Sequence, residues 1–473
     1  MVRRTTVALW ASVTPMLLLL SSVCAAAPYN CGPAASSSRG PIPPDAFACN
    51  GPTPQIDAFA NLMWQAFKMI VWPAEVRRGR LRRGVADPRR SLADLRGPRV
   101  FETFKADWET FLPSASPPSE WTAYSATATA CRNNPRIDPG DLVLADLAEF
   151  GNVQEQGGND QSGGSITNVL VGQNRKLVRY LVAFDQKEFD LILKKKLYDA
   201  SHSSGAAAAP DGTIIVKSAW LELEGLNVDH GTFYRRRALV QDPETLKCRE
   251  AVVGLVGLHI RYKTPTRPHW IWASFEHVRN VPPAGEGASR SQTQTTNSPS
   301  AYIFNDGSGT PMPDRPPPDT RLGSDTFSAH PAPYNVQRLK PIAPELEDAN
   351  RRWQASLAGT PWANYQLVLV EWPGLGSSSK ISALEAKPEP PSFTNQHSNL
   401  VNTTMETFLQ NGAGPTSQGM RFTCMGCHNG ARQVDYVFTI LLNAKSPAHI
   451  QKESRSRREM IDYLRSIVDP PAR

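Results

Sequence analysis

Three residues near the C-terminal end of this 473-residue chain have the types and spacing that can hold a metal-containing ring: Cys424, Cys427 and His428, in the order C-x-x-C-H. Two thiols three positions apart can form thioethers with the two vinyl-derived carbons of one haem, and the adjacent histidine can then bind the iron. Covalent attachment holds a haem without the deep pocket that a non-covalent haem needs. We therefore expect one covalently attached haem c, with Cys424 and Cys427 as anchors and His428 as the axial iron ligand.

Other chemistries use part of the same pattern, and three of them remain open. A zinc site requires two further Cys or His ligands at matching spacing, and the nearby His397 and His449 are isolated in the sequence. A thioredoxin-like redox pair is expected at the start of a helix that follows a strand, whereas residues 412–419 are rich in Gly, Pro and Ser. A structural disulfide within the motif is the third alternative. No Ser/His/Asp set, phosphate loop or paired carboxylates indicate a second chemistry.

The ligand on the second face of the iron decides what such a centre does. A methionine or histidine there gives an electron carrier, whereas an open position permits ligand chemistry. Four side chains are candidates, and each has ordinary packing or exposure as its alternative: Met460 on an apolar helical stripe, His449 in a loop, and His259 and His277 on expected strands. The tryptophans of the segment that ends at His277 could also line a haem face or a small site. The sequence leaves this ligand undecided.

The N-terminus predicts export. Arg3 and Arg4 precede an apolar stretch over residues 7–20, and residues 25–27 are the small alanines at which signal peptidase cuts. The apolar stretch is shorter than the roughly 20 residues of a membrane span. We expect a cleaved signal peptide over residues 1–27, a periplasmic mature chain and no transmembrane segment in that chain. An uncleaved membrane anchor and a lipoprotein modified at Cys24 are the alternatives. Haem is attached to c-type cytochromes on this exported side of the membrane.

Charge gives little information about partners. The formal net charge of +7 falls to +5 when Arg3 and Arg4 leave with the signal peptide, a mild excess over this length. No nucleic-acid-binding module accompanies it, so we expect a redox partner protein and no nucleic acid. One denser basic run predicts a solvated surface loop, with docking to an acidic partner or an anionic membrane as the alternative: Arg77, Arg78, Arg80, Arg82, Arg83, Arg89 and Arg90.

Four cysteines remain outside the signal peptide and the motif: Cys31, Cys49, Cys131 and Cys248. An even number of cysteines in an oxidising compartment favours disulfides. Three pairings are possible, and the most local one joins Cys31 to Cys49 and leaves Cys131 to Cys248. Free buried thiols are the alternative.

Hydrophobic periodicity predicts an α+β fold, in which a large mixed or antiparallel sheet with flanking helices precedes a small, mostly helical C-terminal haem-binding segment. We expect a Pro- and Ser-rich leader over residues 28–52, an α+β domain over 53–372 with an irregular surface excursion over 281–335, and the haem-binding segment over 395–473. Helical spacing predicts helices over residues 59–70, 101–111, 185–197, 344–357, 403–409 and 456–468. Strands are expected over residues 177–184, 213–223, 232–240, 252–262, 270–278 and 366–372, with 252–262 and 270–278 as an antiparallel pair.

Three segments resemble a group of large exported bacterial proteins of the cytochrome c family. They are residues 402–408 (NTTMETF) together with the CMGCH that follows, residues 270–277 (WIWASFEH) and residues 362–367 (WANYQL). The resemblance extends over most of the mature chain, from the helix around Trp64 onward. It implies covalent haem binding at the three motif residues and names no substrate. Small class I cytochromes differ, because their C-x-x-C-H lies near the start of the domain, whereas only 45 residues follow the motif here.

These observations favour a monohaem c-type cytochrome that transfers electrons in the periplasm, with the iron cycling between Fe(III) and Fe(II). The alternative is a haem-dependent oxidoreductase of the peroxidase or dehydrogenase kind, because far more residues precede the haem segment than an electron carrier needs. A haem-based sensor or binding module with an open iron position is a third class. The catalytic residues, the substrate and the redox partner are not identifiable from the sequence.

Overall fold

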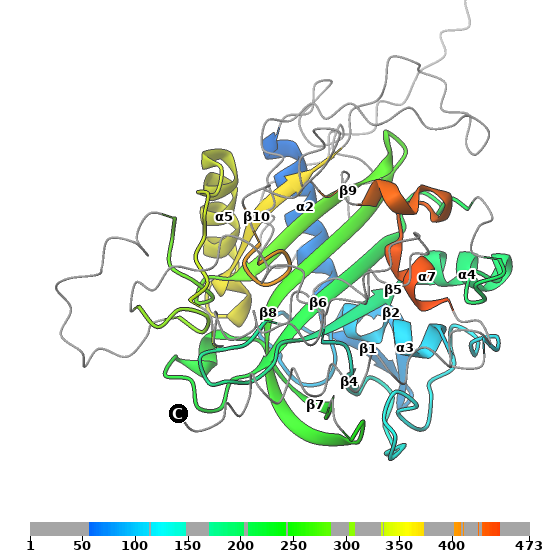
Figure 1. Ribbon diagram of the computed structural model, residues 1–473. Helices are drawn as coiled ribbons and strands as arrows, with labels where there is room; N and C mark the ends of the chain where they lie inside the picture. Colours follow the sequence, from blue (N-terminus) through cyan, green and yellow to red (C-terminus); the bar gives the residue numbers. More distant parts are fainter. Residues whose placement is uncertain are drawn as a thin grey trace, which may run out of the picture.

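A computed structural model describes residues 56–112, 115–147, 170–202, 207–242, 245–284, 302–307, 333, 335–372, 402–407, 410, 424 and 428–444. Within these ranges a large curled sheet is flanked by helices (Figure 1), so the predicted α+β class is confirmed. The predicted signal peptide, leader and 456–468 helix lie outside the described residues.

The sheet is mostly antiparallel, and its central strand is the long β8 (Cys248–Thr264). The predicted hairpin of β8 with β9 is confirmed, with His259 opposite Ser274. Along one path the strands follow the order β10 (Tyr365–Glu371), β9 (Arg267–His277), β8, β6 (Ile214–Glu222), β5 (Arg179–Phe184) and β3 (Lys105–Ala106). Off this path, β7 (Arg235–Gln241) pairs with the first part of β8, and β4 (Leu142–Leu144) runs parallel to β7.

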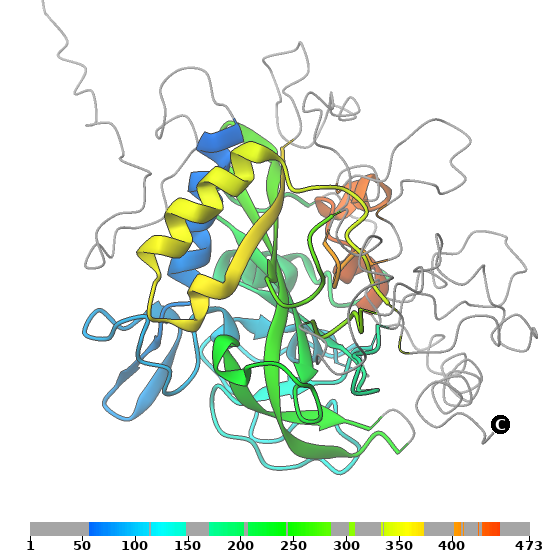
Figure 2. The same cartoon turned by 90° about the vertical axis from the view of Figure 1, so that its left-hand side faces the viewer.

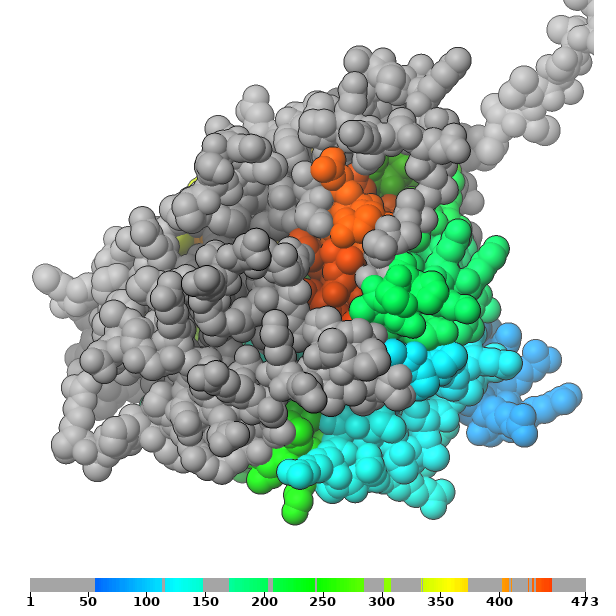
Figure 3. Space-filling model, turned by 45° about the vertical axis from the view of Figure 1, so that its right-hand side comes forward, coloured from blue at the N-terminus to red at the C-terminus, as the bar shows by residue number. Residues whose placement is uncertain are grey.

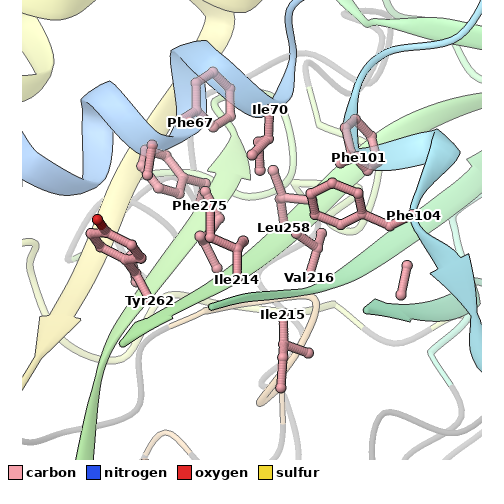
Figure 4. Packing of buried hydrophobic residues seen from close by; sticks show 14 of the residues in the cluster. Phe67, Ile70, Phe101, Phe104, Ile214, Ile215, Val216, Leu258, Tyr262 and Phe275 are labelled. Atoms are coloured by element: carbon pink, nitrogen blue, oxygen red, sulfur yellow. The ribbon is translucent and has the colours of Figure 1, made fainter. Parts of the chain in front are cut away.

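Two helices, α2 (Ile56–Ile70) and α5 (Pro344–Ser356), cover one face of the sheet (Figure 2). Their partly apolar faces meet through two reciprocal hydrogen bonds, from Trp64 Nε1 to Asn350 Oδ1 at 3.1 Å and from Trp353 Nε1 to Asn61 Oδ1 at 2.9 Å. Below them, aromatic and aliphatic side chains of α2 and of the sheet interlock, among them Phe67, Ile70, Leu258 and Phe275 (Figure 4). This layer is the main apolar core.

The C-terminal segment lies on the opposite face of the sheet, so the sheet is the middle of three layers (Figure 2). The segment contains a 3-10 helix (Asn429–Val434) and α7 (Phe438–Asn443), and α4 (Gln186–Lys195) lies nearby (Figure 1). Strand alternation assigns side chains to the two faces, and Ile215 points away from Ile214 and Val216 (Figure 4).

One predicted helix is wrong. Residues 101–111 form a 3-10 turn (Phe101–Thr103), the short β3 and the four-residue α3 (Asp107–Thr110) instead of one helix. The chain becomes extended at Phe104 because Lys105 and Ala106 form the last strand of the sheet, β3, which pairs with β5. Apolar residues at helical spacing thus reach the core here through turns and a strand.

The basic run predicted as a surface loop is a β-hairpin of β1 (Ala74–Arg77) and β2 (Arg80–Ala86). Its tip is exposed, but Arg83 is only 6% exposed and forms an ion pair with Glu109 of α3 at 2.9 Å. The guanidinium of Arg83 also lies 3.9 Å from the ring centre of Tyr124. One arginine of the run therefore fastens the hairpin to the body of the protein.

The predicted Cys131–Cys248 disulfide is present and links the loop before β4 to the first residue of β8. Cys31 and Cys49 lie outside the described residues. Part of the predicted surface excursion is buried, since Ile303 and Phe304 are inaccessible and pack in a second apolar cluster. Among the helices of the described ranges, none has the length and apolar character to cross a bilayer.

Candidate functional site

The motif lies on the sheet face opposite α2 and α5. Strand register aligns three side chains in one row across this face: Glu371 of β10, Trp272 of β9 and Arg261 of β8. The C-terminal segment contacts this row at two residues, Glu371 and Trp272. The backbone N–H of Cys424 donates to Glu371 Oε2 at 2.9 Å, and the ring centre of His428 lies 5.9 Å from that of Trp272.

The imidazole of His428 is held in one orientation by the backbone. Its Nδ1 lies 2.7 Å from the carbonyl oxygen of Tyr436, so Nδ1–H donates to that oxygen and Nε2 remains for a metal. The rings of Trp272 and Phe438 flank the imidazole, the latter with ring centres 5.2 Å apart. Burial lowers the pKa of His428 to about 3, with the positive charge of Arg261 adding to the shift. The imidazole is therefore neutral, which is the form that binds iron. Cys427 lies outside the described residues.

Three residues with positive φ meet beside His428. Asp435 and Tyr436 have φ of 53° and 65°, and Trp270 has φ of 75°. Such conformations cost of order 1–3 kcal/mol each and persist where surrounding contacts impose them. Here the carbonyl of Asp435 accepts hydrogen bonds from Trp270 Nε1 at 3.0 Å and from Arg261 Nη2 at 3.2 Å. These contacts impose the turn that aims the Tyr436 carbonyl at His428.

Four buried charged side chains gather under this turn. Asp435 Oδ2 lies 2.5 Å from Lys263 Nζ and also accepts from the backbone N–H of Ala209 at 2.8 Å. Glu188 of α4 is fully buried, and neither carboxylate oxygen has a hydrogen-bond partner among the described residues. Burial raises the pKa of Glu188 to about 8, and the negative charge of Asp435 adds to this shift. Burial lowers the pKa of Arg261 to about 10, which leaves it charged at neutral pH.

A second stretch of the C-terminal region, residues 402–407, crosses the same face and contacts Glu276, two rows from Trp272. Glu276 of β9, fully buried, accepts hydrogen bonds from the backbone N–H and the hydroxyl of Thr403, both at 2.9 Å. The predicted 403–409 helix is wrong for its described part, which forms turns. Asn402 Oδ1 accepts the backbone N–H of Thr404 at 2.8 Å and that of Met405 at 3.1 Å, so Asn402 and not Thr403 caps this turn.

His277, one of the four candidates for the second iron ligand, is a structural residue. Its Nε2 lies 3.0 Å from the carbonyl oxygen of Thr232, and its Nδ1 accepts the backbone N–H of Arg279 at 3.1 Å. The ring stacks on Phe233 with centres 3.6 Å apart. Both ring nitrogens are occupied, so neither can bind iron.

His259 remains a candidate for the second ligand. It lies on the same sheet face as the motif, two positions before Arg261, and its Nε2 is 2.8 Å from Glu406 Oε1. A carboxylate partner of this kind orients many metal-binding histidines. The other two candidates, His449 and Met460, lie outside the described residues.

Sequence reasoning missed the side chains that hold the motif in place. Glu371, Lys263 and Glu188 come from three separate elements, and only the tertiary fold brings them to the C-terminal segment. Asp435 carried a usable signal, because this acidic residue stands between Val434 and the apolar residues that begin at Tyr436. A charge inside an apolar run indicates a buried partner.

Comparisons of the sequence with protein-family models and with curated proteins, and of the structure with solved structures, find no match. The residues around His428 fit a haem on their own chemistry. They provide a neutral imidazole with one nitrogen bound to a carbonyl, flanking aromatic rings, and a cysteine four positions earlier whose backbone is fixed to the sheet.

Proposed function

We propose that this chain is an exported c-type cytochrome that carries one covalent haem and transfers electrons in the periplasm. The observation that supports this most directly is the 2.7 Å hydrogen bond from His428 Nδ1 to the Tyr436 carbonyl. It selects the tautomer whose Nε2 binds a metal, which a histidine of the surface or the core does not require. A bound haem supplies a one-electron Fe(III)/Fe(II) couple. One electron enters from a donor protein and one leaves to an acceptor, and no atom is transferred.

The residues of the chain perform three tasks in this proposal. Cys424 and Cys427 would anchor the haem, because addition of each S–H across one vinyl group forms a thioether and consumes no oxidant. His428 would ligate the iron, and the rings of Trp272 and Phe438 exclude water from the His428 side of the site. Part of the 428–444 segment reaches the molecular surface (Figure 3), which supports electron exchange with a docked partner.

Haem attachment is tested on the full chain, expressed in a bacterial host that attaches haem to exported proteins. We expect the periplasmic protein to keep its haem stain in a denaturing gel and to have a mass higher by one haem. The double variant Cys424→Ser/Cys427→Ser loses both signals, while His202→Gln, which changes an exposed histidine outside the site, keeps them. An exported wild-type chain without stain and without added mass refutes the proposal.

The same preparation separates an electron carrier from the two alternatives. If the reduced protein keeps its visible spectrum when carbon monoxide is added, both axial positions are filled and the carrier role is supported. A high-spin spectrum that shifts with carbon monoxide or peroxide supports a haem oxidoreductase or a sensor. His259→Gln tests the remaining described ligand candidate, because loss of a His259 ligand opens the iron to carbon monoxide.

A further inference from the structure

We propose that Arg261 sets the reduction potential of the iron, by placing a buried and unneutralised positive charge beside His428. This inference rests on the proposed function, because it requires a haem at the motif. A fixed positive charge destabilises Fe(III) more than Fe(II), since Fe(III) carries one more positive charge. Arg261 therefore raises the potential.

The geometry places the guanidinium next to the proximal ligand. The Cζ of Arg261 lies 4.4 Å from the ring centre of Trp270 and 5.2 Å from that of Trp272. The Trp272 ring is in turn 5.9 Å from the His428 ring. The Arg261 side chain is 7% exposed, so solvent screens its charge weakly.

The surrounding groups leave this charge without a matched counter-charge. Among the described residues Arg261 forms no ion pair, since its Nη2 donates to the backbone carbonyl of Asp435 and its Nε has no hydrogen-bond partner. The carboxylates of Asp435 and Glu188 act on Arg261 only at longer range. The Asp435 carboxylate is bound to Lys263 at 2.5 Å, so these two charges offset each other. Glu188, the other buried acid nearby, is mostly protonated at neutral pH because burial raises its pKa to about 8.

The size of the effect follows from Coulomb's law. We take an effective dielectric constant of about 20 and a distance of roughly 10 Å between the guanidinium and the redox centre. A unit charge then changes the equilibrium between Fe(III) and Fe(II) about tenfold. For a one-electron couple a tenfold change corresponds to about 59 mV.

The test compares Arg261→Gln, which removes the charge, with Arg261→Lys, which keeps it. Arg249→Gln is the matched control, because Arg249 lies at the other end of the same strand with a side chain 54% exposed. Each haem-loaded protein is titrated with dithionite and ferricyanide in the presence of redox dyes, and the visible spectrum reports the reduced fraction. A haem stain on the same samples records attachment.

We expect Arg261→Gln to make the iron about tenfold harder to reduce, equivalent to about 59 mV, with Arg249→Gln unchanged. At about pH 6 Arg261→Lys retains the wild-type potential. At about pH 9 it falls below wild type, because a buried lysine has lost most of its charge there, whereas the arginine, with a pKa of about 10, keeps most of its charge. This second variant decides the matter if Arg261→Gln fails to fold.

Two results overturn the inference. One is a haem-loaded Arg261→Gln with the wild-type potential, and the other is an Arg261→Lys that follows wild type at both pH values. A wild-type chain without haem stain instead refutes the proposed function.

Discussion

Replacement of Asp435 by Asn tests whether the buried Asp435–Lys263 ion pair holds the C-terminal segment on the sheet. Asn tolerates positive φ and can still accept the N–H of Ala209, so the change removes mainly the charge. The Lys263 ammonium, 4% exposed, then lacks its counter-charge. Breaking a buried ion pair by removal of one partner costs about 3–5 kcal/mol. Ionisation of the neighbouring Glu188 offsets part of this cost, so we expect a loss near about 3 kcal/mol in the free energy of unfolding.

The loss is measured by urea unfolding at neutral pH, followed by tryptophan fluorescence. Asp348→Asn is the control, because the Asp348–Arg351 pair has side chains 56% and 67% exposed. Exposed pairs contribute about 0–1 kcal/mol. If Asp435→Asn is no more destabilising than Asp348→Asn, the pair with Lys263 does not hold the segment, and the argument is wrong.

Three further predictions concern the same scaffold. Burial raises the pKa of Glu188 from its ordinary value of 4.5 to about 8, so the wild type loses stability as the pH rises through this window. Glu188→Gln removes this loss, which is at most about 1.4 kcal/mol per pH unit, and urea unfolding at about pH 5 and pH 8 measures it. Reduction of the Cys131–Cys248 disulfide, which spans 117 residues, lowers stability by about 2–5 kcal/mol, as unfolding with and without reductant shows. Gly257→Ala presses a methyl group against the Thr404 hydroxyl and costs about 1–3 kcal/mol, part of which Thr404→Ala recovers in thermal unfolding.

Each of these predictions has a clear contrary result. A Glu188→Gln variant with the pH profile of wild type shows that the carboxyl is not buried in the protonated form. An unfolding midpoint that reductant leaves unchanged, while thiol titration confirms reduction, removes the stabilising role of the disulfide. A Gly257→Ala variant as stable as wild type means that residues 402–407 do not rest on β8.

Local signals in the sequence were sufficient for much of the fold. The apolar stripe of α2 predicted its buried face, and two alternating runs around Pro265 and Pro268 predicted the β8–β9 hairpin, because strand pairing across a short turn is a local event. The helix predicted over residues 101–111 is wrong because apolar spacing does not report pairing with β5, a strand distant in the sequence. In the same way, the sequence predicts that Arg83 is exposed to solvent, because its buried partner Glu109 becomes its neighbour only in the folded chain.

The site was predictable only at its centre. C-x-x-C-H identifies Cys424, Cys427 and His428, because the spacing itself carries the chemistry. The partners of these residues, such as Glu371 and Arg261, depend on which strands adjoin and in what register, and a single sequence does not specify either. The motif can therefore be found from the sequence alone, but the residues that surround it require the three-dimensional structure.

Glu371, Trp272 and Arg261 lie in one row only because of the register between their strands. The pairing register of the sheet therefore decides which side chains face the C-terminal motif. Side chains alternate between faces with a period of two, so an odd-numbered slip of β9 against β8 would rotate Trp272 to the side of α2 and turn Phe275 toward the motif. If one residue inserted into the turn shifts the register by one, the side chains of β9 that now face His428 point to the other side of the sheet. The hairpin keeps its backbone hydrogen bonds. The two-residue turn between Thr264 and Arg267 therefore decides which side chains lie beside His428.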